Sequence, residues 1–265
     1  MIALAAGAAL IAASSAPIAR PLPPSTVVAP TPLLKAGYMR IGRRGIAFLP
    51  DRKAGEALPL LVLFHGAGST AQDMMRVLIP EAAARGLALL AVQSEAQTWD
   101  LITRHFATGE ASLLRSNEVL PGGDRRSADA AIALLKTQAT IDPARVGALG
   151  FSDGASYALS IGAAEPSRFS FVAGFSPAFA LIPDGKDDSG QRIFIAHGRQ
   201  DTVLPFRQSR DAICPDFYHS GRLVRFRAFD GDHVISRAVL HEALDDFLIP
   251  SSRPPAGDRA YHCDR

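Results

Sequence analysis

The sequence predicts an α/β protein whose central sheet is mostly parallel and covered by helices on both faces. Short, uninterrupted apolar runs, which are typical of strands buried on both faces, alternate with segments of helical periodicity. This alternation is the pattern of parallel strands joined by crossover helices. A length of 265 residues suits one such domain better than two, and a hydrophobic content of 48% supplies a large core.

The first 36 residues are expected to precede this domain, which we place at 37–265. Residues 1–16 are small and apolar, shorter than the roughly 20 residues of a bilayer span, and typical of a secretory signal. We therefore expect a signal peptide at 1–19, a proline-rich linker at 20–36 and a secreted or periplasmic protein. No Lys or Arg precedes the apolar run, so a cytoplasmic protein with a hydrophobic N-terminus is the alternative.

Apolar runs predict the strands of the sheet. A hairpin at 38–48, with Gly42 and Gly45 at its turn, comes first. The buried strands that follow are expected at 58–64, 87–92, 145–151, 169–175, 192–196 and 223–229.

Helical periodicity predicts the segments between these strands. Ser69 and Gln72 have the spacing of a capping box, which indicates a helix from there to about residue 84. A second helix is expected at 124–138, and a helix of small residues at 154–164. Apolar residues at spacing four, beginning with Ile235, predict a closing helix.

A candidate nucleophile lies where one strand ends, which is where ligands bind in sheets of this type. The strand at 145–151 runs into Gly150-Phe151-Ser152-Asp153-Gly154 and then into the small-residue helix. Such a G-x-S-x-G turn between strand and helix projects the serine hydroxyl above the sheet, and the glycines on either side avoid steric clashes. We therefore predict that Ser152 is a nucleophile.

A serine hydroxyl needs a neighbouring base, and the base needs an acid that orients it. In the chain order serine, acid, histidine, His233 is the candidate base because it lies in a turn directly after the last predicted strand. Asp201 follows the preceding strand and is the candidate acid. Asp232 is a rival acid, although a sequence neighbour seldom faces the ring nitrogen, and His241 is expected to be structural because it lies inside the closing helix.

Acyl transfer also needs two backbone N–H groups that stabilise the negative oxygen formed on the way. We predict the N–H of Asp153, directly after the nucleophile, and that of Ala67, in the loop that follows the first buried strand. Glycines let the backbone of this loop approach a substrate, so His65 and Gly66 are candidate substrate contacts. The alternative for His65 is that it braces the loop.

Residues 93–123 form the longest stretch without clear periodicity and are expected to overhang the site. Trp99 in this stretch is a candidate wall of the substrate pocket, and the alternative is a packing anchor for the loop. Ser176 also ends a strand, but Pro177 follows it, so a second nucleophile turn is not expected there.

Four motifs in this order resemble the phospholipase/carboxylesterase branch of the α/β-hydrolases, which is also similar to dienelactone hydrolases and polyhydroxybutyrate-depolymerase-like esterases. The motifs are His65-Gly66-Ala67-Gly68, Gly150-Phe151-Ser152-Asp153-Gly154, His197-Gly198 with Asp201 and Pro205, and Gly231-Asp232-His233. The resemblance covers about residues 58–248. It implies an α/β-hydrolase fold and hydrolysis of carboxylic esters or thioesters through an acyl-enzyme on Ser152, with neither cofactor nor metal.

Two departures from this branch limit what the resemblance implies about substrate. Asp153 stands where carboxylesterases of the branch often have Gln, and Ala155 stands where a second Gly is common. An acidic side chain near the forming oxyanion is expected to disfavour anionic substrates. Dienelactone hydrolases typically carry Cys at the turn, so Ser152 argues against that activity.

The resemblance implies a small-molecule ester as the partner, and composition argues against other partners. The net charge of +2 and the absence of a basic tract argue against nucleic acid. No stable membrane span is expected, and the oligomeric state stays open. A prolyl-oligopeptidase-like peptidase shares the motifs and their order and is the alternative function; a non-catalytic binding module is a third, weakened by the presence of serine, histidine and aspartate together.

Cys214 and Cys263 are the only cysteines, which excludes a disulfide scaffold or a cysteine-based metal site. A single bridge that fixes the polar C-terminal tail is expected if the protein is exported to an oxidising compartment. Two unrelated thiols are the alternative.

Overall fold

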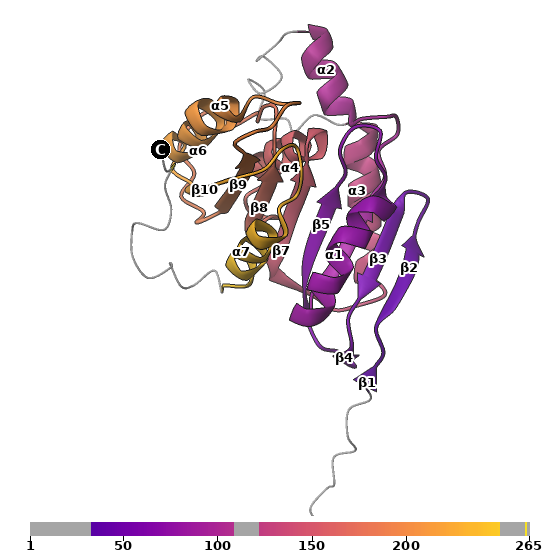
Figure 1. The fold of residues 1–265 in the computed structure, drawn as a ribbon. Coiled ribbons are helices and arrows are strands. Elements are labelled where there is room, and N and C mark those ends of the chain that lie inside the picture. The colour runs from indigo at the N-terminus through magenta and orange to yellow at the C-terminus, as the bar shows by residue number, and fades with distance from the viewer. Residues whose placement is uncertain (1–32, 109–121, 250–262, 264–265) are drawn as a thin grey trace, which may run out of the picture. The chain divides into compact units, whose positions relative to one another are not determined.

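A sheet of eight strands lies at the centre of the computed structural model, which describes residues 33–108, 122–249 and 263 (Figure 1). The strands lie in the order β10-β9-β8-β7-β5-β6-β3-β2. Their bounds are β2 Gly37–Ile41, β3 Gly45–Leu49, β5 Leu58–Phe64, β6 Ala88–Val92, β7 Ile141–Phe151, β8 Phe171–Phe175, β9 Arg192–Gly198 and β10 Leu223–Phe229. Neighbours from β10 to β6 are parallel, and β3 is antiparallel to both β2 and β6. The prediction of a mostly parallel sheet is confirmed.

The expected signal peptide and most of the expected linker lie outside the described residues. Leu33–Leu34, at the end of that linker, form β1 and pair antiparallel with β4, Arg52–Lys53.

Helices cover both faces of the sheet, because successive residues of a strand point to opposite sides and both sides are apolar. In β5, Val62 and Phe64 belong to one core, whereas Leu61 and Leu63 belong to the other. The first core is covered by α2 Asp100–Thr108, α3 Gly123–Lys136, α4 Asp153–Ala164 and α6 Cys214–His219. The second is covered by α1 Ala71–Arg85 and α7 Arg237–Leu248. This two-sided burial explains why the strands are uninterrupted apolar runs.

The capping box of α1 lies one residue later than predicted. Thr70 is the N-cap, and its side chain accepts a hydrogen bond from the N–H of Asp73 at 3.2 Å. The carboxylate of Asp73 in turn accepts from the N–H of Thr70 at 3.0 Å. The predicted pair of Ser69 and Gln72 is therefore wrong, because an aspartate can take the role that the motif usually gives to Glu or Gln.

Three other helical segments add to or depart from what the sequence predicts. Helix α2 occupies part of the stretch that shows no clear periodicity in the sequence. The segment after Asp201 consists of α5 Phe206–Gln208, a π-helical turn at Ser209–Ile213, and α6. Helix α7 begins after the N-cap Ser236, so Ile235 lies outside it.

A buried carboxylate links α1 to α7. Glu81 on α1 contacts Arg85 at 3.0 Å, Arg237 at 2.9 Å and His241 at 2.7 Å. The hydrogen bond from His241, with those from Arg237 and Arg85, lowers the pKa of Glu81 from its ordinary 4.5 to about 2 in spite of desolvation. His241 therefore has the structural role that the sequence predicts.

We expect Glu81→Gln to lower the midpoint of thermal unfolding at pH 7, because Arg85 and Arg237 lose their shared counter-ion and His241 loses its carboxylate partner. The pKa of Glu81 is depressed in the folded state, so its contribution is complete above about pH 4.5 and lost as the pH falls toward 2. The difference between parent and variant, measured by calorimetry, should therefore shrink across that range. The exposed Asp245, which pairs with Arg85 at 3.0 Å, supplies the control Asp245→Asn; an equal loss in both variants would contradict the prediction.

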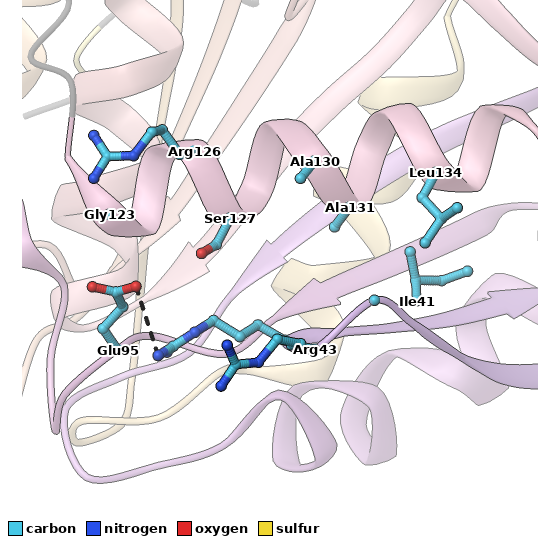
Figure 2. Close-up of a pocket in the computed structure, with 11 residues that line it drawn as sticks. Ile41, Arg43, Glu95, Gly123, Arg126, Ser127, Ala130, Ala131 and Leu134 are labelled. Atoms are coloured by element: carbon cyan, nitrogen blue, oxygen red, sulfur yellow. Dashed lines mark ion pairs between the residues drawn. The ribbon is translucent and has the colours of Figure 1, made fainter.

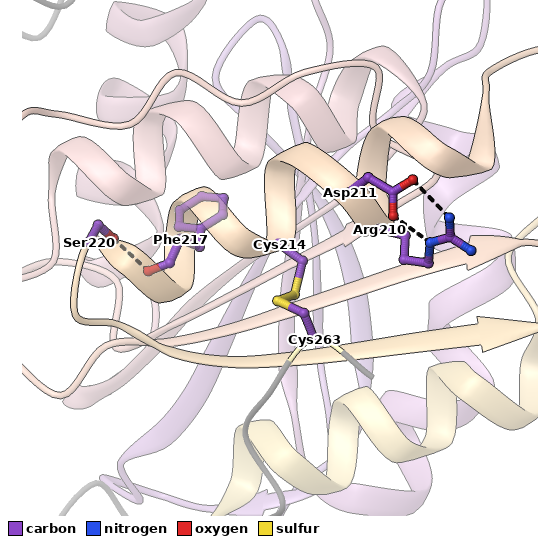
Figure 3. Close-up of a disulfide and its surroundings, with 6 residues drawn as sticks. All are labelled: Arg210, Asp211, Cys214, Phe217, Ser220 and Cys263. Atoms are coloured by element: carbon purple, nitrogen blue, oxygen red, sulfur yellow. Dashed lines mark hydrogen bonds and ion pairs between the residues drawn. A yellow bond between two sulfur atoms is a disulfide. The ribbon is translucent and has the colours of Figure 1, made fainter. Parts of the chain in front are cut away.

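Cys214 and Cys263 form the disulfide that was expected for an exported protein (Figure 3). Their Cα atoms are 5.8 Å apart, well within the range for a bridge. Cys214 is buried at the start of α6, directly after the π-helical turn. The bond joins this helix to the C-terminal tail across 49 positions of sequence.

Replacing both cysteines by serine is expected to lower the free energy of unfolding by roughly 2–4 kcal/mol, because the open chain has more conformational freedom when unfolded. Denaturant titration measures this difference, and a reductant should destabilise the parent protein but leave the variant unchanged. Thiol counting on the denatured, unreduced parent should find no free thiol. Two free thiols would reject the bridge.

A cavity of about 390 Å³ lies between the β2–β3 turn and α3 (Figure 2). Its polar end is lined by Arg43, Arg44, Arg126 and Glu95, and Arg44 pairs with Glu95 at 3.6 Å. None of the predicted site residues lines it.

In the part of the chain that is described, no helix is long and apolar enough to cross a bilayer. Within the same ranges, no group of three or more His, Cys, Asp or Glu side chains is placed to hold a metal ion.

Candidate active site

Ser152 lies at the junction of β7 and α4 with a backbone conformation that is strained for a residue with a side chain. Its φ is 56° and its ψ is −124°. The turn is tight because a Cβ at position 150 would lie 1.9 Å from the carbonyl oxygen of Gly154, and one at position 154 would lie 2.2 Å from that of Phe64. The structure thus shows the turn predicted from the glycine spacing.

The predicted oxyanion donors belong to the loop after β5 and to the start of α4. A Cβ at Gly66 would lie 3.2 Å from the Cβ of Ser152, so the loop after β5 reaches Ser152 directly. The N–H of Gly68 donates to the carbonyl of Gln97 at 2.7 Å, which fixes the loop. Among the described residues, no acceptor takes up the N–H of Ala67 or that of Asp153 at the start of α4.

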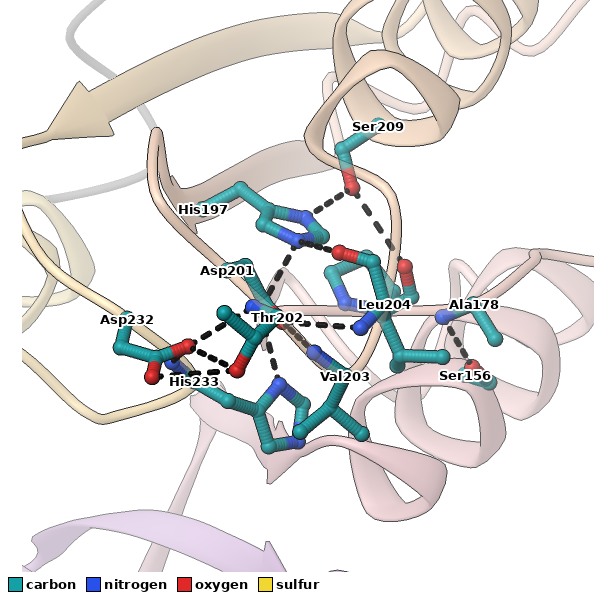
Figure 4. Close-up of polar contacts among 11 residues, drawn as sticks. Ser156, Ala178, His197, Asp201, Thr202, Val203, Leu204, Ser209, Asp232 and His233 are labelled. Atoms are coloured by element: carbon teal, nitrogen blue, oxygen red, sulfur yellow. Dashed lines mark hydrogen bonds and ion pairs between the residues drawn. The ribbon is translucent and has the colours of Figure 1, made fainter.

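Asp201 and His233 form a hydrogen-bonded pair at the ends of β9 and β10. His233 Nδ1 lies 2.8 Å from Asp201 Oδ2, and the Asp201 side chain is fully buried (Figure 4). Its other oxygen accepts from the N–H groups of Val203 at 2.9 Å and Leu204 at 2.8 Å. Burial raises the pKa of Asp201, but the hydrogen bonds from Leu204, His233 and Val203 outweigh it and hold the pKa below its usual value. Asp201 is therefore a fixed anion that faces one nitrogen of His233.

His233 lies beside the turn that carries Ser152. Its ring packs against that of Phe151, the residue before the nucleophile, with 4.8 Å between ring centroids. Ser152 and His233, both among the described residues, are not joined by a hydrogen bond. In enzymes without substrate this bond is often long and tightens only when substrate binds.

The rival acid, Asp232, does not face the ring. Its Oδ1 accepts from the N–H of Thr202 at 2.7 Å and from the N–H of His233 at 2.8 Å. These bonds hold the loop after β10 against the loop after β9. Asp232 thus braces the backbone around the pair formed by Asp201 and His233.

Known proteins with similar chains are esterases and serine hydrolases. No family model matches the sequence. NocK of Nocardia uniformis subsp. tsuyamanensis, named as a candidate esterase, is 31% identical over 154 residues, which are 57% of this chain and 42% of that protein. The chain therefore spans about two fifths of the length of this relative.

Solved structures share the arrangement of the sheet and helices. FphF, a fluorophosphonate-binding serine hydrolase of Staphylococcus aureus, matches with a TM-score of 0.57 and 13% identity, over 83% of this chain and 99% of its own. The carboxylesterase of Bacillus cereus matches with a TM-score of 0.55 and 14% identity, over 77% and 92%. The chain is an α/β-hydrolase by fold. The fold implied by the resemblance is confirmed.

Burial corrects two predicted substrate contacts and favours the alternatives that the sequence left open, a packing anchor for Trp99 and a brace for His65. Trp99 is fully buried, stacks on Tyr157 with 4.6 Å between ring centroids, and donates its Nε1–H to the carbonyl of His65 at 2.8 Å. His65 is also fully buried, and its Nε2 accepts from the N–H of Ser94 at 3.2 Å. Neither side chain offers a surface to a substrate. Both instead anchor the loop that carries Gly66 and Ala67.

Other polar residues of the site could not be assigned from the sequence. Thr98 donates to the carboxylate of Asp153, which turns that side chain toward the stretch before α2. Ser176 at the end of β8 also has a positive φ, of 52°, and its buried hydroxyl lies close enough to Asp201 to help lower the pKa of that carboxyl without forming a well-aligned hydrogen bond. His197, which belongs to the His-Gly motif, has no role predicted from the sequence, yet it makes polar contacts with Ser209, Leu204 and Asp201. The four-residue spacing from His197 to Asp201 was the one signal in the sequence.

Asp201→Asn is expected to slow the reaction of Ser152 with a fluorophosphonate by on the order of 10⁴-fold, because the amide cannot stabilise the imidazolium and favours the wrong tautomer of His233. The rate of covalent labelling, followed by mass spectrometry, measures this effect. His241→Ala is the matched control, since that histidine pairs with Glu81 on α1. A slow His241→Ala variant beside a normal Asp201→Asn variant would refute the assignment.

Proposed function

We propose that this chain is a serine hydrolase of the carboxylesterase type, which cleaves carboxylic esters through an acyl-enzyme on Ser152. Thioesters are the alternative substrates. One observation carries the proposal: a histidine held by a buried aspartate packs against the turn at which a strained serine begins α4. The N–H groups of Ala67 and Asp153, which have no acceptor among the described residues, support it. NocK, FphF and the Bacillus cereus carboxylesterase are similar proteins whose names describe esterases or serine hydrolases.

Acylation begins with attack of Ser152 Oγ on the carbonyl carbon of the ester. His233 Nε2 accepts the serine proton, while Nδ1–H stays bonded to Asp201. The carbonyl oxygen becomes an oxyanion that accepts hydrogen bonds from the N–H groups of Ala67 and Asp153, and the positive end of the α4 dipole adds to this stabilisation. The imidazolium then gives its proton to the alkoxide as the C–O bond breaks, and the alcohol leaves.

Deacylation repeats these steps with water in place of serine. His233 removes a proton from water, whose oxygen attacks the acyl carbon and forms a second oxyanion in the same pair of N–H groups. Collapse of this intermediate releases the acid and returns the proton to Ser152. Asp201 remains ionised throughout, in keeping with the lowered pKa of its carboxyl.

We also propose that the protein works outside the cytoplasm, in the periplasm or the medium. The disulfide between Cys214 and Cys263 supports this, because such bonds persist in oxidising compartments. The apolar residues 1–16 have the character of a secretory signal.

Ser152→Ala tests the proposed function. We expect kcat for nitrophenyl esters to fall by on the order of 10⁶-fold and fluorophosphonate labelling to disappear, with an unchanged circular dichroism spectrum. A panel of esters with rising acyl length identifies the best substrate. Ser176→Ala is the matched control, because Ser176 also ends a strand at positive φ but has a buried hydroxyl, and it should still be labelled. Labelling that survives in Ser152→Ala and is lost in Ser176→Ala would overturn the proposal.

A further inference from the structure

We propose that His197 is a positioning residue for Asp201, and that Ser209 holds His197 in the tautomer that this role requires. The proposal rests on the proposed function, since it assumes that Asp201 orients the base of a serine hydrolase. Figure 4 shows the four side chains one after another in space, in the order Ser209, His197, Asp201 and His233.

The contacts of His197 fix which nitrogen carries its proton. His197 lies near the end of β9 and is fully buried. Its Nε2 lies 3.0 Å from Asp201 Oδ2 and 3.2 Å from the carbonyl oxygen of Leu204. A carboxylate and a carbonyl can only accept, so Nε2 must carry the hydrogen.

The other nitrogen of His197 meets a group that can donate. Nδ1 lies 2.7 Å from the hydroxyl oxygen of Ser209, which is fully buried in the π-helical turn after α5. The carbonyl of Pro177, at 3.5 Å, is the more distant acceptor for that hydroxyl. Burial, partly offset by the contacts with Leu204 and Asp201, lowers the pKa of His197, so the ring is neutral near pH 7. The hydroxyl of Ser209 therefore donates to Nδ1 and leaves the only ring hydrogen on Nε2.

A neutral His197 with this tautomer completes the set of donors around Asp201. Oδ1 accepts from the N–H groups of Val203 and Leu204. Oδ2 accepts from His233 Nδ1–H and lies 3.0 Å from the Nε2–H of His197, which is shared with the carbonyl of Leu204. Three of these four donors belong to the same strand end and loop as Asp201 itself. When His233 moves during catalysis, Oδ2 thus keeps one fixed donor and the carboxylate keeps its orientation.

The neutral state of His197 also determines where positive charge collects. Both histidines contact one carboxylate, which can balance a single cation. The charge of His233 further lowers the pKa of His197, and the desolvation of the buried ring acts in the same direction. The imidazolium therefore forms on His233, which lies beside the nucleophile turn, and not on His197.

The test is a double-mutant cycle on ester hydrolysis, with His197→Phe, Asp201→Asn and their combination. We expect His197→Phe to lower kcat by roughly 10- to 100-fold, the scale of one charge-assisted hydrogen bond, with KM unchanged. In the Asp201→Asn background the same replacement should have almost no further effect, because His197 acts through the carboxylate. A purely structural role would instead give the same loss in both backgrounds, and this result would overturn the proposal.

Two further variants keep the test decisive if His197→Phe does not fold. Ser209→Ala should lower kcat by a smaller factor, and again only while Asp201 is present. His197→Gln, which retains a donor, should recover part of the loss. Ser220→Ala is the matched control, because its buried hydroxyl donates to the carbonyl of Phe217 and has no link to Asp201; kcat should not change.

Failure of this inference is distinguishable from failure of the proposed function. Full activity in Ser152→Ala would reject the serine mechanism, and the role of His197 with it. The other outcome is that Ser152→Ala is inactive and Asp201→Asn has a low kcat, while His197→Phe lowers kcat by the same factor in the parent and in Asp201→Asn. That outcome would reject only the role of His197.

Discussion

The site depends on the close approach of the α4 start to the ends of β5 and β7. Side chains at positions 150 and 154 would overlap backbone atoms, at 1.9 and 2.2 Å from a Cβ, so only glycine permits this contact. The approach forces Ser152 into its strained conformation and brings the N-terminal end of α4 beside the loop that carries Ala67. Strain at one residue is tolerated because strands buried on both faces hold the surrounding backbone.

The polar groups around this turn are connected from one strand end to the next. Asp201 accepts hydrogen bonds from two histidines and from its own loop, Asp232 ties that loop to the one that carries His233, and Trp99 and His65 brace the opposite side. These polar groups lie on loops and strand ends, and Trp99, His65 and His197 among them are fully buried. The arrangement keeps several donors fixed before substrate arrives, which is the condition for efficient stabilisation of an oxyanion.

Much of this was predictable from the sequence because strand burial and the glycine turn leave strong local signals. The sheet, the position of Ser152 and the pairing of Asp201 with His233 followed from apolar runs and from residues placed at strand ends. The capping residue of α1 was misplaced because Ser69 and Thr70 both fit the motif. For Trp99 and His65 the sequence left both a substrate contact and a packing role open, because spacing does not reveal which way a side chain points, and both point into the protein. Helix α2 was missed because its neighbours in sequence show no clear period.

The disulfide described above has a topological consequence for the integrity of the site. The chain between Cys214 and Cys263 contains β10, His233 and all of α7, so the bond makes these elements part of a closed covalent ring. A protease that cuts once within this ring opens it without releasing a fragment. His233 and the helix that follows it remain attached to the part of the molecule that carries Ser152 and Asp201. In the reduced protein, a cut between Cys214 and His233 would instead leave His233 on a separate chain.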